Sequence, residues 1–124
     1  MAEMVQNSSV PILVVEDNRT QGEYLRYVLE KEGYPVTIAT NGKEALISMS
    51  KGRPHLVLTD VMMPEMDGHE LCSAIKNDPA TSDIPVILVT HLFNPVDVIK
   101  GLEAGADNFI IKPYTPEVIH TRIA

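Results

Sequence analysis

The chain has 124 residues, of which 44% are hydrophobic and 22% are charged, and its formal net charge is −7. This length is close to the commonest size of a single domain, and the composition is typical of a globular protein rather than a disordered one. Apolar runs reach only about five or six residues, far short of the roughly 20 that a membrane-spanning helix needs. No basic stripe is present, so we expect this domain itself to bind neither nucleic acid nor membrane.

Residues 1–9 are polar and contain neither a basic start nor an apolar stretch. We therefore expect a disordered N-terminal tail rather than a secretory signal. Cys72 is the single cysteine, which excludes an internal disulfide and is typical of a reducing cytoplasm. Because it lies beside Leu71 and one helical turn before Ile75, we expect a buried structural thiol.

Five short runs rich in β-branched residues predict strands. They are Ile12–Val15, Val36–Ala39, Leu56–Thr59, Val86–Val89 and Asn108–Ile111. Each run is nearly continuous in apolar character, as expected for strands that are buried on both faces of a parallel sheet.

Amphipathic stretches with a helical period lie between the predicted strands. Their apolar positions are Leu25, Val28 and Leu29, then Ala45, Leu46 and Met49, then Leu71, Ala74 and Ile75, and finally Val98, Ile99 and Leu102. Three glycines follow helical patterns, at a position that favours a left-handed residue: Gly33, Gly52 and Gly105. The pair Thr115-Pro116 predicts the N-cap and first residue of a last helix.

This alternation predicts an α/β fold, because parallel strands need right-handed helical crossovers that cover both faces of the sheet. Five units of this size favour a doubly wound, flavodoxin-like parallel sheet with strand order 2-1-3-4-5. In such a sheet the functional crevice lies beyond the carboxyl ends of the strands, between strands one and three.

Chemically useful side chains follow four of the five predicted strands. Glu16 and Asp17 follow strand one, Asp60 follows strand three, Thr90 follows strand four and Lys112 follows strand five. Three clustered carboxylates repel one another, and one lysine offsets only one charge. Hard oxygen ligands select a divalent cation such as Mg²⁺, with Mn²⁺ as a substitute.

These residue types suit phosphoryl transfer. Asp60 can attack phosphorus to form an acyl phosphate. A metal ion, Lys112 and the Thr90 hydroxyl can hold the phosphoryl oxygens. Taken singly, each residue has a plainer explanation, such as helix capping, surface charge, a strand exit or a satisfied strand hydroxyl. Their coincidence at one edge of the sheet favours a site.

Four segments resemble the signature segments of response-regulator receiver domains: "ILVVEDN", "LVLTDVMMPEMDG", "PVILVT" and "GADNFIIKPY". The resemblance runs from about Pro11 to the end of the chain. It implies that Asp60 is the phosphoacceptor and that Glu16 and Asp17 form the acidic pair around Mg²⁺, with Asp17 a direct ligand. The backbone carbonyl of Met62 corresponds to a further ligand.

The resemblance also implies roles for residues of the second half of the chain. Thr90 corresponds to the switch hydroxyl and Lys112 to the lysine that bridges to the phosphoryl group. Phe109 matches the aromatic residue that turns inward as the switch closes. Gly68 matches the glycine that ends the loop after the acceptor.

A receiver domain of this kind, here residues 10–124, implies a phosphorelay function rather than an enzyme. The donor would be a phosphohistidine on a histidine kinase or a histidine phosphotransfer domain. The signal would appear on the face of helix four, strand five and helix five, which would regulate an output domain or partner, with a homodimer as one arrangement. We expect a cytoplasmic location and, because the last helix is short, a natural protein that continues past Ala124.

Several positions depart from the commonest pattern or stand outside it. His91 follows Thr90 where a small residue is usual, and its ring could hinder donors or contact the phosphoryl group. Met62 and Leu92 are apolar where the hydrolytic water would enter, which predicts slow self-dephosphorylation. The remaining histidines lack ligand spacing, so surface or capping roles are expected: His55, His69 and His120.

Three alternatives compete with the receiver interpretation. A phosphohydrolase of the haloacid-dehalogenase type would need an aspartate where Met62 stands. A flavodoxin-like cofactor binder would need a phosphate-binding loop in place of "EDNRTQGEY". A receiver fold that regulates by binding alone would not need the complete set of site residues.

Overall fold

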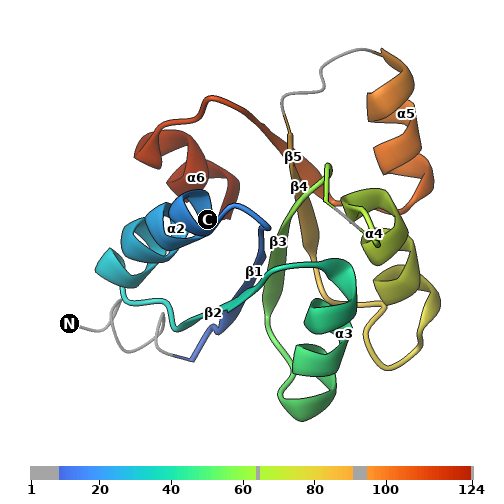
Figure 1. Ribbon diagram of the computed structural model, residues 1–124, viewed down its shortest axis with the longest axis horizontal. Coiled ribbons are helices and arrows are strands. Elements are labelled where there is room, and N and C mark those ends of the chain that lie inside the picture. The colour runs from blue at the N-terminus through green and yellow to red at the C-terminus, as the bar shows by residue number, and fades with distance from the viewer. Residues whose placement is uncertain (1–8, 64, 91–94, 124) are drawn as a thin grey trace.

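The computed structural model of the protein describes residues 9–63, 65–90 and 95–123. Within these ranges, five strands alternate with five helices (Figure 1). The strands are β1 (Ile12–Val15), β2 (Val36–Ala39), β3 (Leu56–Asp60), β4 (Val86–Thr90) and β5 (Asn108–Ile111). The helices are α2 (Arg19–Lys31), α3 (Gly42–Lys51), α4 (Gly68–Asn77), α5 (Pro95–Glu103) and α6 (Pro116–Ile123).

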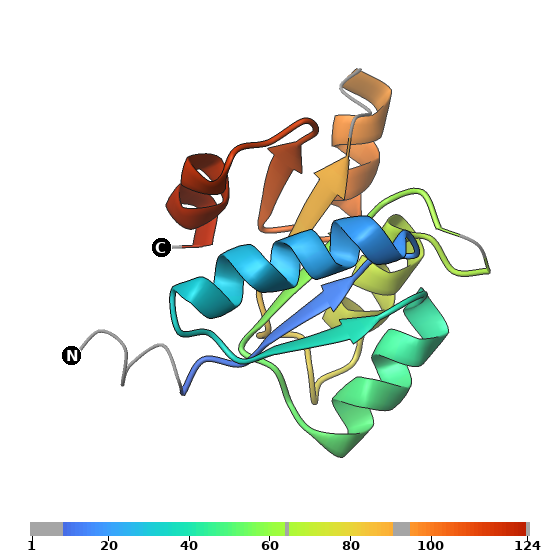
Figure 2. The ribbon, with the colours of Figure 1, turned by 60° about the vertical axis from the view of Figure 1, so that its left-hand side comes forward.

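The sheet has the order β2-β1-β3-β4-β5 and every neighbouring pair is parallel, which confirms the predicted topology. All strands therefore point their carboxyl ends toward one edge, as Figure 2 shows. β3 and β4 each run one residue further than predicted. Asp60 and Thr90 are consequently the last residues of their strands, and ladder pairing with Val89 and Ile111 fixes their positions.

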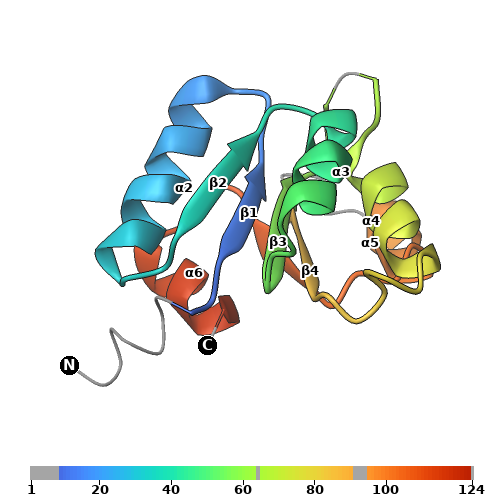
Figure 3. The ribbon, with the colours of Figure 1, turned by 90° about the horizontal axis from the view of Figure 1, so that it is seen from below.

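Helices cover both faces of the sheet: α2 and α6 lie on one side, and α3, α4 and α5 on the other (Figure 3). Each face has its own apolar core, the first around Val14, Leu29 and Ile119 and the second around Leu71 and Ile75. β1, β3 and β4 are buried along their whole length. The edge strands β2 and β5 are only partly buried, because each lacks a neighbour on one side; the expectation of full burial was wrong there.

The helix ends follow the local sequence signals in most places. Thr115 accepts a hydrogen bond from the backbone N–H of Val118 through its hydroxyl oxygen, as the predicted N-cap of α6. Gly33 and Gly105 have φ of 94°, which confirms the predicted left-handed conformation. Gly52 is different: its φ is −167°, which is extended backbone that any residue adopts. The chain leaves α3 straight toward β3, so no left-handed residue is needed.

The amphipathic pattern predicted the buried face of α4 but not that of α5. Ile99 is 52% exposed and Leu102 is 60% exposed, and the one buried residue of α5 is Gly101. A Cβ atom built on Gly101 would lie 2.6 Å from the ring of Phe109 and 3.0 Å from Leu88. The aromatic ring of β5 fills the space that a side chain of α5 would otherwise occupy.

Cys72 is buried, as expected. Its Sγ lies 3.4 Å from the carbonyl oxygen of Ala104, and burial raises the pKa of the thiol to about 11. The thiol therefore stays protonated near neutral pH and acts as a packing group. Within the described residues, none of the helices is long and apolar enough to cross a membrane.

Candidate functional site

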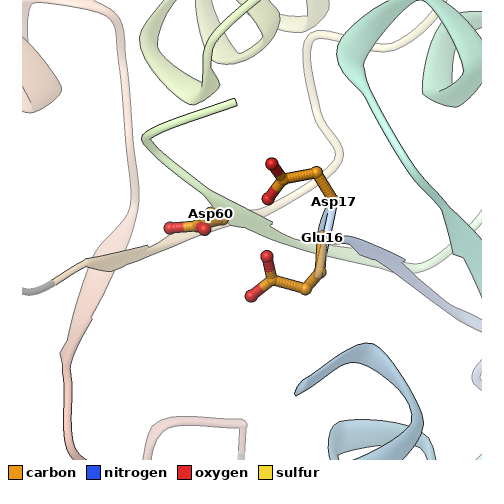
Figure 4. Close-up of side chains that lie close together, drawn as sticks. All are labelled: Glu16, Asp17 and Asp60. Atoms are coloured by element: carbon orange, nitrogen blue, oxygen red, sulfur yellow. The ribbon is translucent and has the colours of Figure 1, made fainter. Parts of the chain in front are cut away.

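Three carboxylates meet at the carboxyl ends of β1 and β3 (Figure 4). Glu16, Asp17 and Asp60 each offer one oxygen, and these oxygens lie within 4.8 Å of one another. The backbone N–H of Glu16 donates to the carbonyl of Ala39 at 2.9 Å, so the β1–β2 ladder continues one residue past the strand. Glu16 and Asp60 are buried, whereas Asp17 is exposed.

Lys112 reaches this cluster from the end of β5. Its backbone N–H donates to the Thr90 carbonyl at 2.9 Å, and its peptide bond to Pro113 is cis. The side-chain Nζ lies 3.3 Å from Glu16 Oε1 and 3.4 Å from Asp60 Oδ2. The structure thus brings together four of the side chains that the sequence placed at the strand ends.

The carboxylate of Asp60 is oriented by its own backbone. The N–H of Val61 donates to Asp60 Oδ1 at 2.9 Å, while Oδ2 faces the ammonium group of Lys112. Gly68 closes the loop that follows, because its N–H donates to the Val61 carbonyl at 2.9 Å. A Cβ atom there would lie 2.3 Å from the carbonyl oxygen of Asp60, so the return of the loop requires glycine.

Burial, together with the nearby charge of Asp60, raises the pKa of the Glu16 carboxyl from 4.5 to about 7. The backbone N–H of Asn18 and the ammonium group of Lys112 act in the opposite direction. Burial is the main cause of this raised pKa, and the ammonium group of Lys112 offsets it only in part.

The donor set fits a divalent cation. Glu16, Asp17 and Asp60 form the one acidic cluster with metal-binding spacing among the described residues. Carboxylate oxygens, with an open side for water and a phosphate, are the ligands that Mg²⁺ prefers. Bound Mg²⁺ would supply positive charge that offsets the repulsion between the carboxylates and an anionic donor.

The expected switch residues lie beside this cluster. Thr90 is buried at the end of β4, next to the strand that carries Asp60. Phe109 is half-buried and packs against the core beneath α5. Thr90 therefore lies on the strand next to that of Asp60, and Phe109 lies one strand further on, against Gly101 of α5.

Other residues singled out in the sequence have plainer surroundings. Met62 is 62% exposed and lines a cleft together with Asp17 and Asp67. His55 is exposed, His69 and His120 are half-buried, and none of the three belongs to the acidic cluster. His91 and Leu92 lie outside the described residues.

Sequence reasoning missed three residues around Lys112. Gln21 accepts a hydrogen bond from Lys112 Nζ at 2.8 Å. The ring of Tyr114 stacks on that of Tyr24, with 6.2 Å between their centroids. Burial and, to a smaller extent, the charge of Glu16 raise the pKa of the Tyr114 hydroxyl to about 12. No local pattern marks these residues, because their contacts join α2 to the segment after β5.

The fold and the acidic strand ends define an α/β switch domain, and sequence comparison identifies its family. The profile of the response regulator receiver domain matches residues 12–124. "Probable transcriptional regulator ycf27" of Porphyra purpurea is 41% identical over 119 residues, which are 96% of this chain and 48% of that protein. "DNA-binding response regulator MtrA" of Mycolicibacterium paratuberculosis is 38% identical over 112 residues, which are 90% of this chain and 48% of that protein. The chain spans about half the length of these relatives.

Solved structures agree. The signal receiver domain of a histidine kinase from Syntrophus aciditrophicus is 46% identical, with a TM-score of 0.87 over 92% of this chain and 86% of that one. A second structure is the receiver domain of a sensor histidine kinase from Pseudomonas aeruginosa, solved with magnesium coordinated in its active-site cleft. It is 26% identical, with a TM-score of 0.85 over 92% of this chain and 93% of that one. The chain belongs to the response regulator receiver domain family. It is a signalling module of two-component systems, and the resemblance seen in the sequence is confirmed.

Proposed function

We propose that this domain accepts a phosphoryl group on Asp60, with the aid of Mg²⁺, from a phosphohistidine of a histidine kinase or phosphotransfer domain. The observation that carries the proposal is the position of Asp60. Its carboxylate is buried, held at Oδ1 by a backbone N–H, and faced at Oδ2 by Lys112 at 3.4 Å. Glu16 and Asp17 lie beside it and carry no covalent role of their own.

The residues have distinct tasks in this proposal. Glu16, Asp17, Asp60 and the carbonyl of Met62 hold Mg²⁺ or Mn²⁺, with Asp17 as a direct ligand. One oxygen of Asp60 forms a bond to phosphorus as the bond from phosphorus to the histidine nitrogen breaks, and the imidazole leaves with a proton. Lys112 holds a phosphoryl oxygen, since an oriented cation stabilises the charge of the transition state.

Intact-mass measurement with Mg²⁺ and a small phosphodonor tests this proposal. The wild type should gain one phosphoryl group, the adduct should be labile to hydroxylamine, and Asp60→Asn should gain none. Full uptake in excess chelator, or uptake that survives in Asp60→Asn, would overturn it. A phosphohydrolase is disfavoured because Met62 has no proton to give to a leaving group.

Phosphorylation would then shift the domain between two conformations. The phosphoryl group adds nearly one further negative charge and several acceptor oxygens, toward which we expect the Thr90 hydroxyl to move. Phe109 follows into the space that Thr90 leaves, and the change appears on the face of α5, β5 and α6, where an output domain or partner binds. Changes of amide exchange confined to α2, α3 and β2 would contradict this.

The lifetime of the phosphorylated state is expected to be minutes or longer. Met62 lies beside the acceptor and its thioether cannot hold a hydrolytic water by a hydrogen bond; Leu92 is expected to act in the same way. The double variant Met62→Asn, Leu92→Glu should lose the phosphoryl group about tenfold faster, or about 1.4 kcal/mol of barrier. A fast wild-type rate that His91→Ala abolishes would show that the imidazole of His91 positions the water instead.

A further inference from the structure

Lys112 has three acceptors around its ammonium group, and one of them belongs to no motif. The shortest contact, 2.8 Å, joins Nζ to the side-chain oxygen of Gln21. The contacts to Glu16 Oε1 and Asp60 Oδ2 are 3.3 and 3.4 Å. The contacts to Gln21 and Glu16 are hydrogen bonds, whereas the contact to Asp60 is an ion pair without a hydrogen bond.

The order of these distances is the reverse of what charge alone would give. Hydrogen bonds between an ammonium group and a carboxylate are ordinarily about 2.7–2.9 Å long, and about twice as strong as neutral ones. Here the neutral amide of Gln21 is at full contact, whereas both carboxylates stay about half an ångström further away. Lys112 is only 9% exposed at its side chain, so solvent does not account for this position.

Gln21 is held in place by the start of α2. It lies in the first turn, where its backbone N–H donates to the N-cap side chain of Asn18 at 3.0 Å. Its side chain is half-buried in a groove lined also by Tyr24, Pro113 and Tyr114. From this point the side chain of Gln21 reaches Lys112, and among the described residues no hydrogen bond joins it to Asp60.

We propose that Gln21 is a positioning residue that holds the ammonium group of Lys112 back from Asp60. The inference rests on the proposed function. A lysine in full contact with Asp60 would occupy the oxygen that has to bind the cation or attack phosphorus. Held by Gln21, Lys112 remains near enough to meet an incoming phosphoryl oxygen and leaves the carboxylate available.

Two variants of equal length separate the acceptor from the bulk of the side chain. Gln21→Met keeps the length and removes the acceptor, so Lys112 should move onto Asp60 and Glu16 and compete with Mg²⁺. The affinity for Mg²⁺ and the maximal rate of phosphorylation should each fall about three- to tenfold, the effect of one hydrogen bond. Gln21→Glu keeps the acceptor and should retain wild-type affinity or exceed it. Neither variant should change the melting temperature much.

The decisive measurements use the metal-free, unphosphorylated protein. The side-chain nitrogen signal of Lys112, assigned with Lys112→Arg, should be shifted in Gln21→Met and retained in Gln21→Glu. Addition of Mg²⁺ alone, followed through the amide signals of residues 59–63, gives the affinities. Identical Lys112 signals in the wild type and Gln21→Met would overturn the inference, as would equal loss of Mg²⁺ affinity in both variants.

The same samples distinguish the two proposals. A wild type that takes up no phosphoryl group would end the proposed function, and the Lys112 signal would still show whether Gln21 sets the position of the ammonium group. A wild type that is phosphorylated normally, together with an unchanged rate in Gln21→Met, would end only the inference about Gln21.

Discussion

Helices α4 and α5 lie on the same face of the sheet and have almost the same length, but they are attached to it very differently. α4 begins with a capping box of Asp67 and Glu70 and buries Leu71, Cys72 and Ile75. α5 buries only Gly101, and it leaves Leu102 largely exposed. Burial of apolar surface is the main source of a helix's stability in a folded protein.

The difference separates a fixed part of the domain from a part that can move at low cost. α4 follows the loop that Gly68 closes by donating its N–H to the carbonyl of Val61, the residue next to the acceptor, so the start of α4 is tied to the end of β3. The buried residue of α5, Gly101, lies against the ring of Phe109, the residue that we propose moves in the switch. A helix held by few buried contacts opens or shifts with a small free-energy change.

Truncation of one apolar side chain in each helix tests this comparison most directly. Ile75→Ala should lower the free energy of unfolding by about 2–5 kcal/mol, since it leaves a cavity in a packed core. Leu102→Ala should change it by no more than about 0.5 kcal/mol, as for exposed positions elsewhere. Urea denaturation of the two variants measures both. Equal losses would mean that α5 is packed as firmly as α4.

A methyl group at Gly101 should reveal how α5 is joined to β5. Gly101→Ala places a Cβ atom against the ring of Phe109, so we expect a loss of about 1–2 kcal/mol from overpacking, although alanine favours the helix. In a Phe109→Ala background the ring is absent, and the same substitution should stabilise the domain by about 1 kcal/mol through helix propensity. Urea denaturation of the wild type, the two single variants and the double variant gives a double-mutant cycle for Gly101 and Phe109. A substitution that has the same sign in both backgrounds would show that the ring does not set the position of α5.

A change of pH should alter the exchange of α4 amides and leave that of α5 amides alone. The folded metal-free protein holds a proton on Glu16 with a pKa of about 7, well above the ordinary 4.5. This stabilisation is complete below about pH 4.5 and is lost as the pH rises to about 7, because only the folded state still binds the proton. Global stability should therefore fall, and the melting temperature should drop by a few degrees.

Amide exchange at pH 5 and pH 7, corrected for intrinsic rates, measures this pH-dependent loss of stability. We expect the amides of α4 to exchange through global unfolding and to lose protection. We expect the amides of α5 to exchange through local opening and to keep the same protection. Glu16→Gln should remove the pH dependence, and Glu103→Gln, at the exposed end of α5, should keep it. Parallel losses of protection in α4 and α5 would show that both helices open together.

The amino-acid sequence by itself predicted the fold and the location of the site. The alternation of apolar runs predicted the five strands and their order, because a parallel sheet needs buried strands and covered faces. The acidic and basic residues at the strand ends predicted a common site, since parallel strands deliver their carboxyl ends to one edge. The mutual approach of Glu16, Asp17, Asp60 and Lys112 agrees with that prediction, while their roles remain predictions.

The tertiary structure alone decided which face of α5 is buried and which side chain holds Lys112. The apolar spacing of Ile99 and Leu102 is a local pattern. Which side chains of α5 are buried depends on the ring of Phe109, which belongs to β5 and already fills the space beneath the helix. Gln21 and Lys112 are separated by 91 positions, so no periodicity or short motif links them. Local sequence fixes conformation within a few residues, whereas the partner of a buried polar or aromatic group is set by the elements that fold against it.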